Sequence, residues 1–137
     1  MVALDLAIHT GVAIYKKNTV NIYEIVNDNP ITQLDNTIKL FPKGTKEILI
    51  EDYVYFAKSK KTVSSLLKRL GYFEYTLFKF NFNVELVHPQ TYQWYMIKEF
   101  NLSDKLKKQK GSSKKKMVIN KFLSEYYGVE LTDNMTD

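Results

Sequence analysis

Two acidic residues lie within or at the end of segments that are otherwise apolar. Asp5 is the only charged residue in the run of residues 2–8, and burying an unpaired carboxylate costs several kcal/mol. Glu51 ends a second apolar run, residues 48–50. A glutamate at a strand end is by itself most often a solvated charge, whereas an aspartate inside a strand has no simple structural role. Asp5 is therefore a candidate functional residue. Glu51 becomes one as well if the fold brings the two side chains together.

Further acidic residues lie near the end of the sequence, where a helix is expected to begin. Asp133 and Asp137 are four residues apart and share a helix face, and Asn134 lies three residues before Asp137. An aspartate near a helix start is commonly only a cap. Clustered carboxylates repel one another, however, and persist when a hard cation such as Mg²⁺ binds their oxygens. Two such ions about 3.5–4 Å apart can hold the attacking water and the leaving oxygen of a phosphoryl displacement.

The order of the predicted elements decides whether these acids can meet. Apolar and alternating runs predict three strands joined by tight turns, then a helix with Asn29 as N-cap and Pro30 at its first position. A fourth strand, a long amphipathic helix, a fifth strand and further helices follow. The predicted strands are residues 2–8, 11–17, 20–26, 48–51 and 84–88, and the predicted helices are residues 30–41, 60–81, 90–100 and 114–127, with a last one beginning at 133.

This order predicts an α/β fold with one mixed five-stranded sheet, whose first three strands are antiparallel, and helices on both faces. The crossover should bring the fourth strand beside the first, which would place Asp5 next to Glu51. Packing the last helix against the sheet would add Asp137 and a neighbour. With 137 residues and no internal repeat, the chain is expected to form a single domain over residues 1–137.

The composition narrows the class of protein. Hydrophobic residues make up 45% and charged residues 26%, with a net charge of +5, which is compatible both with nucleic-acid binding and with simple solubility. The chain has no cysteine, which excludes disulfides and thiolate chemistry and suits a reducing cytoplasm. No apolar run approaches the roughly 20 residues of a membrane helix, and the N-terminus does not have the pattern of a signal peptide.

Two lysine-rich stretches could bind phosphates. Lysines are point charges suited to backbone contacts rather than to bidentate base recognition. Each stretch could also be a solvated face, and the second could be a disordered loop. The first contains Lys58, Lys60, Lys61, Lys68 and Arg69, which is the only arginine, and the second contains Lys105, Lys107, Lys108, Lys110, Lys114, Lys115 and Lys116.

Four segments, in this order, resemble the RuvC family of Holliday-junction resolvases in the ribonuclease-H-like superfamily. VALDLAIHTGVAIY has an acid in strand one and a glycine that begins strand two. ILIEDYVYFAKSKKTVSSLLKRLGYFEYTL has an apolar strand, a glutamate, aromatics, a basic loop and a long helix. VELVHPQTYQWYM followed by KGSSKKKMVINKF resembles the family's strand-proline-aromatic segment and its Gly-x-x-x-Lys loop, and LTDNMTD resembles its closing acidic motif. The likeness spans nearly the whole chain and is greatest to the shorter phage-encoded members.

The resemblance implies four ligands for two Mg²⁺ ions, for which Mn²⁺ can substitute. Asp5 and Glu51 match the first two ligands, and Asp137 matches the last. Family members carry an acid or a histidine at the position of Asn134, so either Asn134 or Asp133 would be the remaining ligand. Of these metal ligands, Asp5, Glu51, Asp133 and Asp137 would also be catalytic residues.

The resemblance also implies DNA contacts. An aromatic residue after the catalytic glutamate stacks on unpaired bases of the junction, worth about 1–3 kcal/mol per base, and Tyr55 or Phe56 would do this here. Lys116, or its close rival Lys114, loosely matches an active-site lysine and would stabilise the phosphorane-like charge. The expected DNA-binding lysines are Lys58, Lys60, Lys61, Lys108, Lys110, Lys114 and Lys115.

The implied function is resolution of Holliday junctions, and of other branched DNA, by Mg²⁺-dependent symmetric nicking in recombination and repair. A homodimer would supply the two cuts, with the aromatic-rich helix over residues 60–81 as a candidate interface. The expected location is the cytoplasm, that of a bacterial host if the chain is phage-encoded. His9 and Thr10 replace the serine and arginine of many members, which leaves the cleavage sequence preference open. The family's last helix continues beyond the closing acid, so we expect natural residues to follow Asp137.

Three alternatives compete with this interpretation. The first is a flap, fork or ribonuclease-H-type nuclease on the same fold. The second is a weak or inactive branched-DNA-binding module whose metal site is broken at Asn134. The third is a protein-interaction domain whose lysines only confer solubility, which predicts no salt-dependent DNA affinity.

Overall fold

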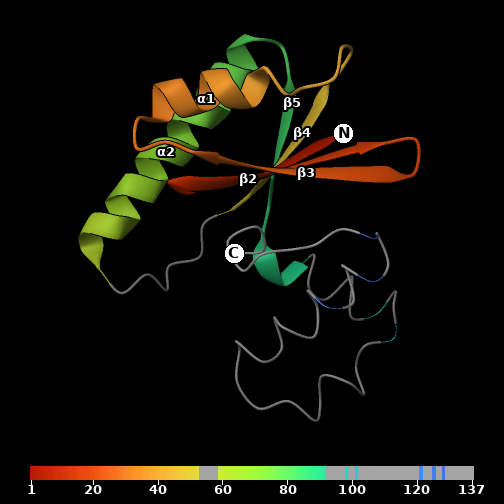
Figure 1. Ribbon diagram of the computed structural model, residues 1–137. Helices are drawn as coiled ribbons and strands as arrows, with labels where there is room; N and C mark the ends of the chain where they lie inside the picture. Colours follow the sequence, from red (N-terminus) through yellow and green to blue (C-terminus); the bar gives the residue numbers. More distant parts are fainter. Residues whose placement is uncertain are drawn as a thin grey trace.

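In the part of the chain that the structure describes, two helices pack against a five-stranded sheet (Figure 1). The computed structural model describes residues 1–52 and 59–91, together with the single residues Lys98, Asn101, Lys121, Glu125 and Gly128. The strands are β1 (Val2–Asp5), β2 (His9–Lys16), β3 (Thr19–Val26), β4 (Glu47–Glu51) and β5 (Asn83–Val87), and the helices are α1 (Pro30–Ile38) and α2 (Lys60–Lys79).

The sheet is mixed, with the strand order β3-β2-β1-β4-β5. β1, β2 and β3 are successively antiparallel, whereas β4 runs parallel to both β1 and β5. Lys17 and Asn18, both at positive φ, form the tight turn between β2 and β3 at the predicted break. The predicted mixed sheet, its antiparallel first half and the neighbouring position of β4 and β1 are therefore confirmed.

Local sequence signals explain where the two helices begin. Asn29 is the N-cap of α1, where its side chain accepts hydrogen bonds from the backbone N–H groups of Ile31 and Thr32, and Pro30 follows at the first helical position. Ser59 caps α2 in the same way and accepts from the N–H of Thr62. The predicted cap of α1 is confirmed, although that helix ends at Ile38, three residues before the predicted end.

The hydrophobic core lies between one face of the sheet and both helices. Alternate residues of the central strands, including Val2, Leu4, Ile48 and Ile50, are buried against Leu34 of α1 and against α2. From α2 come Leu70, Phe73 and Leu77, which recur at helical spacing. α1 and α2 therefore cover the same face. Helices were predicted on both faces, and the helix predicted over residues 114–127 lies outside the described residues apart from Lys121 and Glu125.

The first strand is shorter than predicted, and this changes the position of its acid. Residues 6–8 continue the apolar pattern but leave the sheet in a turn. The Thr10 hydroxyl donates to the Ala7 carbonyl oxygen at 2.9 Å, and the buried Gln33 side chain donates to the carbonyl oxygens of Ala7 and Ile8, both at 2.9 Å. Asp5 is consequently the last residue of β1, not a residue inside it.

Within the described ranges, no helix is long and apolar enough to cross a membrane.

Candidate active site

Asp5 and Glu51 end neighbouring parallel strands. The register pairs Leu4 of β1 with Ile50 of β4, so the next position along each strand brings Asp5 and Glu51 side by side. Neighbouring strands are about 4.8 Å apart, which allows the two carboxylates to share one small ligand. The predicted juxtaposition of these two acids is thus present in the structure.

Both side chains lie on the sheet face opposite the helices. Leu4 and Ile50, which precede them, are buried in the helix-covered core. Because successive side chains of a strand point to opposite faces, Asp5 and Glu51 project from the other face, where both are half-buried. The site therefore lies at the carboxyl ends of β1 and β4, a position where open α/β sheets commonly bind ligands.

A third acid lies in the same row across the sheet. Asp5 pairs with Gly11 of β2, and Gly11 pairs with Glu24 of β3. Paired residues of antiparallel strands share a face, so Glu24 lies on the site side, two strands or about 10 Å from Asp5. Gly11 has no side chain to fill the space between them. Sequence reasoning missed Glu24, although its spacing of two from the apolar Ile22 indicates the same strand face.

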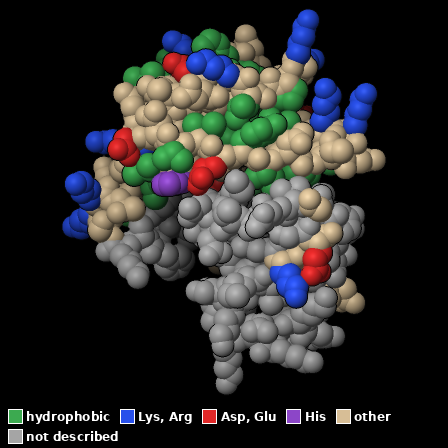
Figure 2. Space-filling view, in the orientation of Figure 1, with side chains coloured by type: hydrophobic (Ala, Val, Ile, Leu, Met, Phe, Trp, Pro, Cys, Tyr) green, Lys and Arg blue, Asp and Glu red, His purple; other side chains and the backbone are tan. Residues whose placement is uncertain are grey.

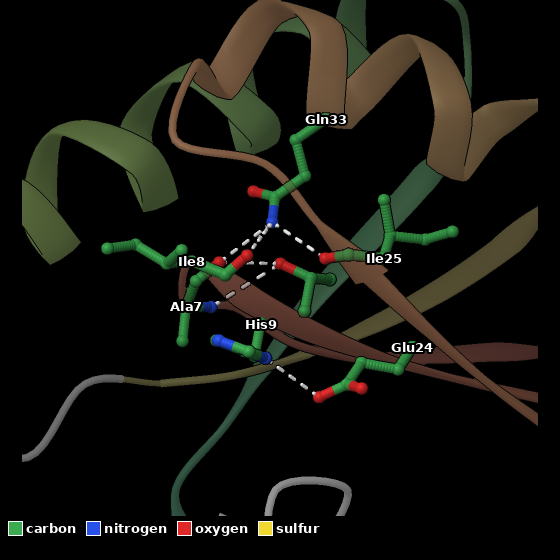
Figure 3. A network of polar contacts seen from close by, with 7 residues as sticks. Ala7, Ile8, His9, Glu24, Ile25 and Gln33 are labelled. Carbon is green, nitrogen blue, oxygen red and sulfur yellow. Dashed lines mark hydrogen bonds and ion pairs between the residues drawn. The ribbon is translucent and has the colours of Figure 1, made fainter.

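Glu24 forms an ion pair with His9 at the start of β2 (Figure 3). The His9 Nδ1 and a Glu24 carboxylate oxygen are 3.0 Å apart, with the side chains 50% and 27% exposed. Figure 2 shows a histidine side chain lying against an acidic one on the surface of the molecule. His9 was noted in the sequence only as a departure from the family pattern, and the structure adds that a carboxylate orients its ring.

A buried polar cluster, formed by Gln33 and Arg69, lies beneath the turn that follows Asp5 (Figure 3 shows the Gln33 side of it). The Gln33 amide donates to the carbonyl oxygens of Ala7, Ile8 and Ile25, and its own oxygen accepts from the Arg69 guanidinium. Sequence reasoning missed this cluster. A glutamine among the apolar positions of α1 would have been its only signal.

Arg69 corrects one sequence prediction. It was grouped with four lysines as a basic, phosphate-binding stretch, but only 4% of its surface is exposed. Burial lowers the pKa of its guanidinium, and the charge of Asp28 acts in the opposite direction. A side chain whose donors point into the protein is not available to DNA. The prediction for Arg69 was wrong because the local charge pattern does not show which side of α2 faces the core.

Lys60 and Lys61 are exposed in the first turn of α2. α2 follows β4 in the chain, so its first turn lies toward the end of the sheet that carries Glu51 (Figure 1). Both side chains are therefore accessible to solvent, and their role as DNA contacts stays a prediction. The other predicted site residues lie outside the described residues, namely Tyr55, Phe56, Lys58, Lys108, Lys110, Lys114, Lys115, Lys116, Asp133, Asn134 and Asp137.

The Asp5–Glu51 pair suits a hard divalent cation, because two carboxylates on adjacent strands supply the oxygen ligands that Mg²⁺ binds. Over residues 1–52, 59–91 and the isolated described positions, no three His, Asp or Glu side chains form a group that could hold a metal ion. The described pair is thus half of the predicted four-ligand set, and the predicted remainder comes from the closing acidic motif.

Comparison with known proteins gives a likeness in structure but none in sequence. No protein-family model matches the chain, and no curated protein matches it. The structure resembles that of RuvC from T. thermophilus in complex with a Holliday junction substrate, with a TM-score of 0.60. The match covers 100% of this chain and 87% of the other, at 10% sequence identity. The chain therefore has a ribonuclease-H-like fold of the kind found in RuvC, which confirms the predicted fold class.

Proposed function

We propose that this protein is a metal-dependent endonuclease that resolves four-way DNA junctions, and other branched DNA, by paired nicks. The observation that carries the proposal is the pair of carboxylates, Asp5 and Glu51, at the carboxyl ends of adjacent parallel strands, on the face of a ribonuclease-H-like sheet opposite α1 and α2. The similarity to a RuvC structure bound to a Holliday junction supports this choice of substrate.

In the proposed mechanism, the acids share one task, which is to bind the metal. Asp5 and Glu51 would hold Mg²⁺ together with Asp137 and either Asp133 or Asn134. When bound there, Mg²⁺ would supply an activated water and neutralise charge on the scissile phosphate. The bond from phosphorus to the 3′-oxygen breaks as the bond to the water oxygen forms, which leaves a 5′-phosphate and a 3′-hydroxyl.

Basic and aromatic residues would hold the DNA. Lys60 and Lys61, in the first turn of α2, would bind phosphates that flank the scissile one, and the lysines of the second stretch would add further contacts. Lys116 or Lys114 would stabilise the transition-state charge. Tyr55 or Phe56 would stack on bases exposed at the branch point.

A homodimer would place two such sites on one junction, and α2 offers an interface. Besides the stripe that faces the core, α2 carries Leu67, Gly71, Tyr75 and Phe78 at helical spacing, and Phe78 is 71% exposed. Tyr75 and Phe78, with Val84 of β5, also line a shallow depression. Phe78→Lys should shift a dimer to monomer in sedimentation equilibrium while the circular dichroism spectrum stays unchanged. A wild-type chain that remains monomeric at high concentration would contradict the homodimer.

The decisive experiment compares a synthetic four-way junction with a linear duplex of matched sequence, with and without Mg²⁺. Wild-type protein should cut two symmetric strands of the junction only, and Glu51→Gln should abolish both cuts. Glu47→Gln, the same substitution at the exposed opposite end of β4, is the matched control and should cut normally. Cuts in flaps and forks as well would indicate broader branch selectivity. Junction binding without cleavage by the wild-type protein would leave a binding module and overturn the nuclease proposal.

A further inference from the structure

The Gln33–Arg69 cluster is buried where an apolar pair would ordinarily suffice. Gln33 is 0% exposed and Arg69 is 4% exposed, and both lie among the hydrophobic residues that pack the helices against the sheet. Burying a polar or charged side chain is favourable only when its hydrogen-bonding groups are satisfied, and apolar residues of similar volume are often at least as stabilising. The cluster therefore calls for an explanation other than stability.

The Gln33 amide holds two separate backbone segments. Its Nε2 donates to the carbonyl oxygens of Ala7 and Ile8, both at 2.9 Å, and of Ile25 at 3.1 Å. Ala7 follows Asp5 by two residues, and Ile25 follows Glu24 directly. The Gln33 side chain thus holds both the turn that follows Asp5 and the strand that carries Glu24.

Arg69 fixes Gln33 from the opposite side. Its Nη1 donates to the Gln33 side-chain oxygen and, at 3.2 Å, to the Asn27 carbonyl oxygen, while Nη2 donates to the Asp28 carbonyl oxygen at 3.0 Å. These bonds need a planar fork with several donors, which arginine has and lysine lacks. This requirement explains why the only arginine of a chain otherwise rich in lysine is found here.

We propose that Gln33 and Arg69 are positioning residues that lock the β1–β2 turn and thereby hold Asp5 in the geometry that a divalent cation requires. Neither side chain touches the site. Gln33 acts through the carbonyl oxygens of Ala7 and Ile8, two and three residues after Asp5, and Arg69 acts through Gln33. The inference rests on the proposed function, because it assumes that Asp5 and Glu51 bind the metal.

The test measures metal binding apart from cleavage. Mn²⁺ should bind the wild-type protein in isothermal titration calorimetry, and the free Mn²⁺ concentration at half saturation, the Mn²⁺ midpoint, reports its affinity. Gln33→Met keeps the volume and removes the hydrogen bonds, whereas Arg69→Lys keeps the charge and removes the fork. Both should raise the Mn²⁺ midpoint about 10–100-fold, the usual effect of losing a group that orients a ligand. Asn36→Met, one turn further along α1 and outside the cluster, should leave it unchanged.

The outcomes separate the two proposals. Variants that melt at lower temperature but keep the wild-type Mn²⁺ midpoint would show a purely structural cluster and overturn the positioning role. A wild-type protein that does not bind Mn²⁺, as Glu51→Gln should not, would instead overturn the proposed metal site. If both cluster variants fail to fold, Thr10→Val loosens the same turn by removing the hydroxyl bonded to Ala7. A raised Mn²⁺ midpoint in Thr10→Val supports the positioning role, and an unchanged midpoint contradicts it.

Discussion

The two faces of the sheet differ in burial, although the same short strands contribute alternate residues to both. On β4, Ile48 and Ile50 are fully buried against the helices, while Leu49 and Glu51 lie on the other side and are only half-buried. β1 repeats this alternation, with Asp5 on the half-buried face. One face therefore packs in the core with α1 and α2, and the other carries the two carboxylates of the proposed site. Substitutions one residue apart should consequently have opposite effects on stability and on activity.

The largest expected effect is on the site face. Asp5→Asn and Glu51→Gln should each lower the proposed junction cleavage by about a thousandfold or more, because each would remove a charged ligand of the proposed metal site. Their free energy of unfolding without metal should stay within about 1 kcal/mol of the wild-type value, as neither side chain belongs to the core. Single-turnover cleavage and urea denaturation measure the two quantities. A variant that also lost its fold would remove the distinction between the faces.

Ile50→Ala tests the opposite face at the adjacent position. Loss of a fully buried side chain should reduce the free energy of unfolding by about 2–5 kcal/mol. The protein that remains folded should keep the wild-type Mg²⁺ requirement, because the site face is unchanged. Urea denaturation gives the first quantity and a Mg²⁺ titration of cleavage the second. A large shift in the Mg²⁺ midpoint would show that the two faces are coupled.

Leu49→Ala sharpens the comparison, since it changes the same strand and a similar side chain on the site face. Leu49 is only half-buried, so its truncation should cost about 1–2 kcal/mol. Urea denaturation beside Ile50→Ala checks the ranking. Equal losses for the two variants would mean that the site face contributes to packing as much as the helix-covered face does.

The smallest effect is expected for Glu24→Gln. Its ion pair with His9 is largely exposed, and such pairs contribute about 0.2–1 kcal/mol. A double-mutant cycle with His9→Gln, at low and high salt, isolates this interaction. A coupling energy above that range, or one insensitive to salt, would show that the pair belongs to a more rigid site than its exposure suggests.

Sequence patterns were sufficient for the architecture because each signal is local. The five strands, the cap at Asn29 and the long helix follow from alternation, helical spacing and a proline. The meeting of Asp5 with Glu51 needed one further rule, that a crossover brings β4 beside β1, and the structure confirms it.

The errors arose where distant residues override a local pattern. Residues 6–8 are apolar and predict a strand, yet bonds from Thr10 and from Gln33, 26 residues from Ala7, turn the chain there. Arg69 belongs to a basic stretch by composition and to the core by its position on α2. Glu24 joins the site face through a pairing with Gly11 that becomes visible only once the strand register is known.

The central position of β1 has a consequence for how the protein folds. β1, β2 and β3 are joined by short turns, so this meander can form early from local contacts. Pairing of β1 with β4 joins Val2 to Ile48, 46 residues along the chain (48 − 2), and must wait for a much larger loop to close. A nascent chain would therefore complete its antiparallel half before Glu51 reaches Asp5. We expect amide protons of β2 and β3 to gain protection from exchange before those of β4, so that the two carboxylates of the proposed site meet late in folding.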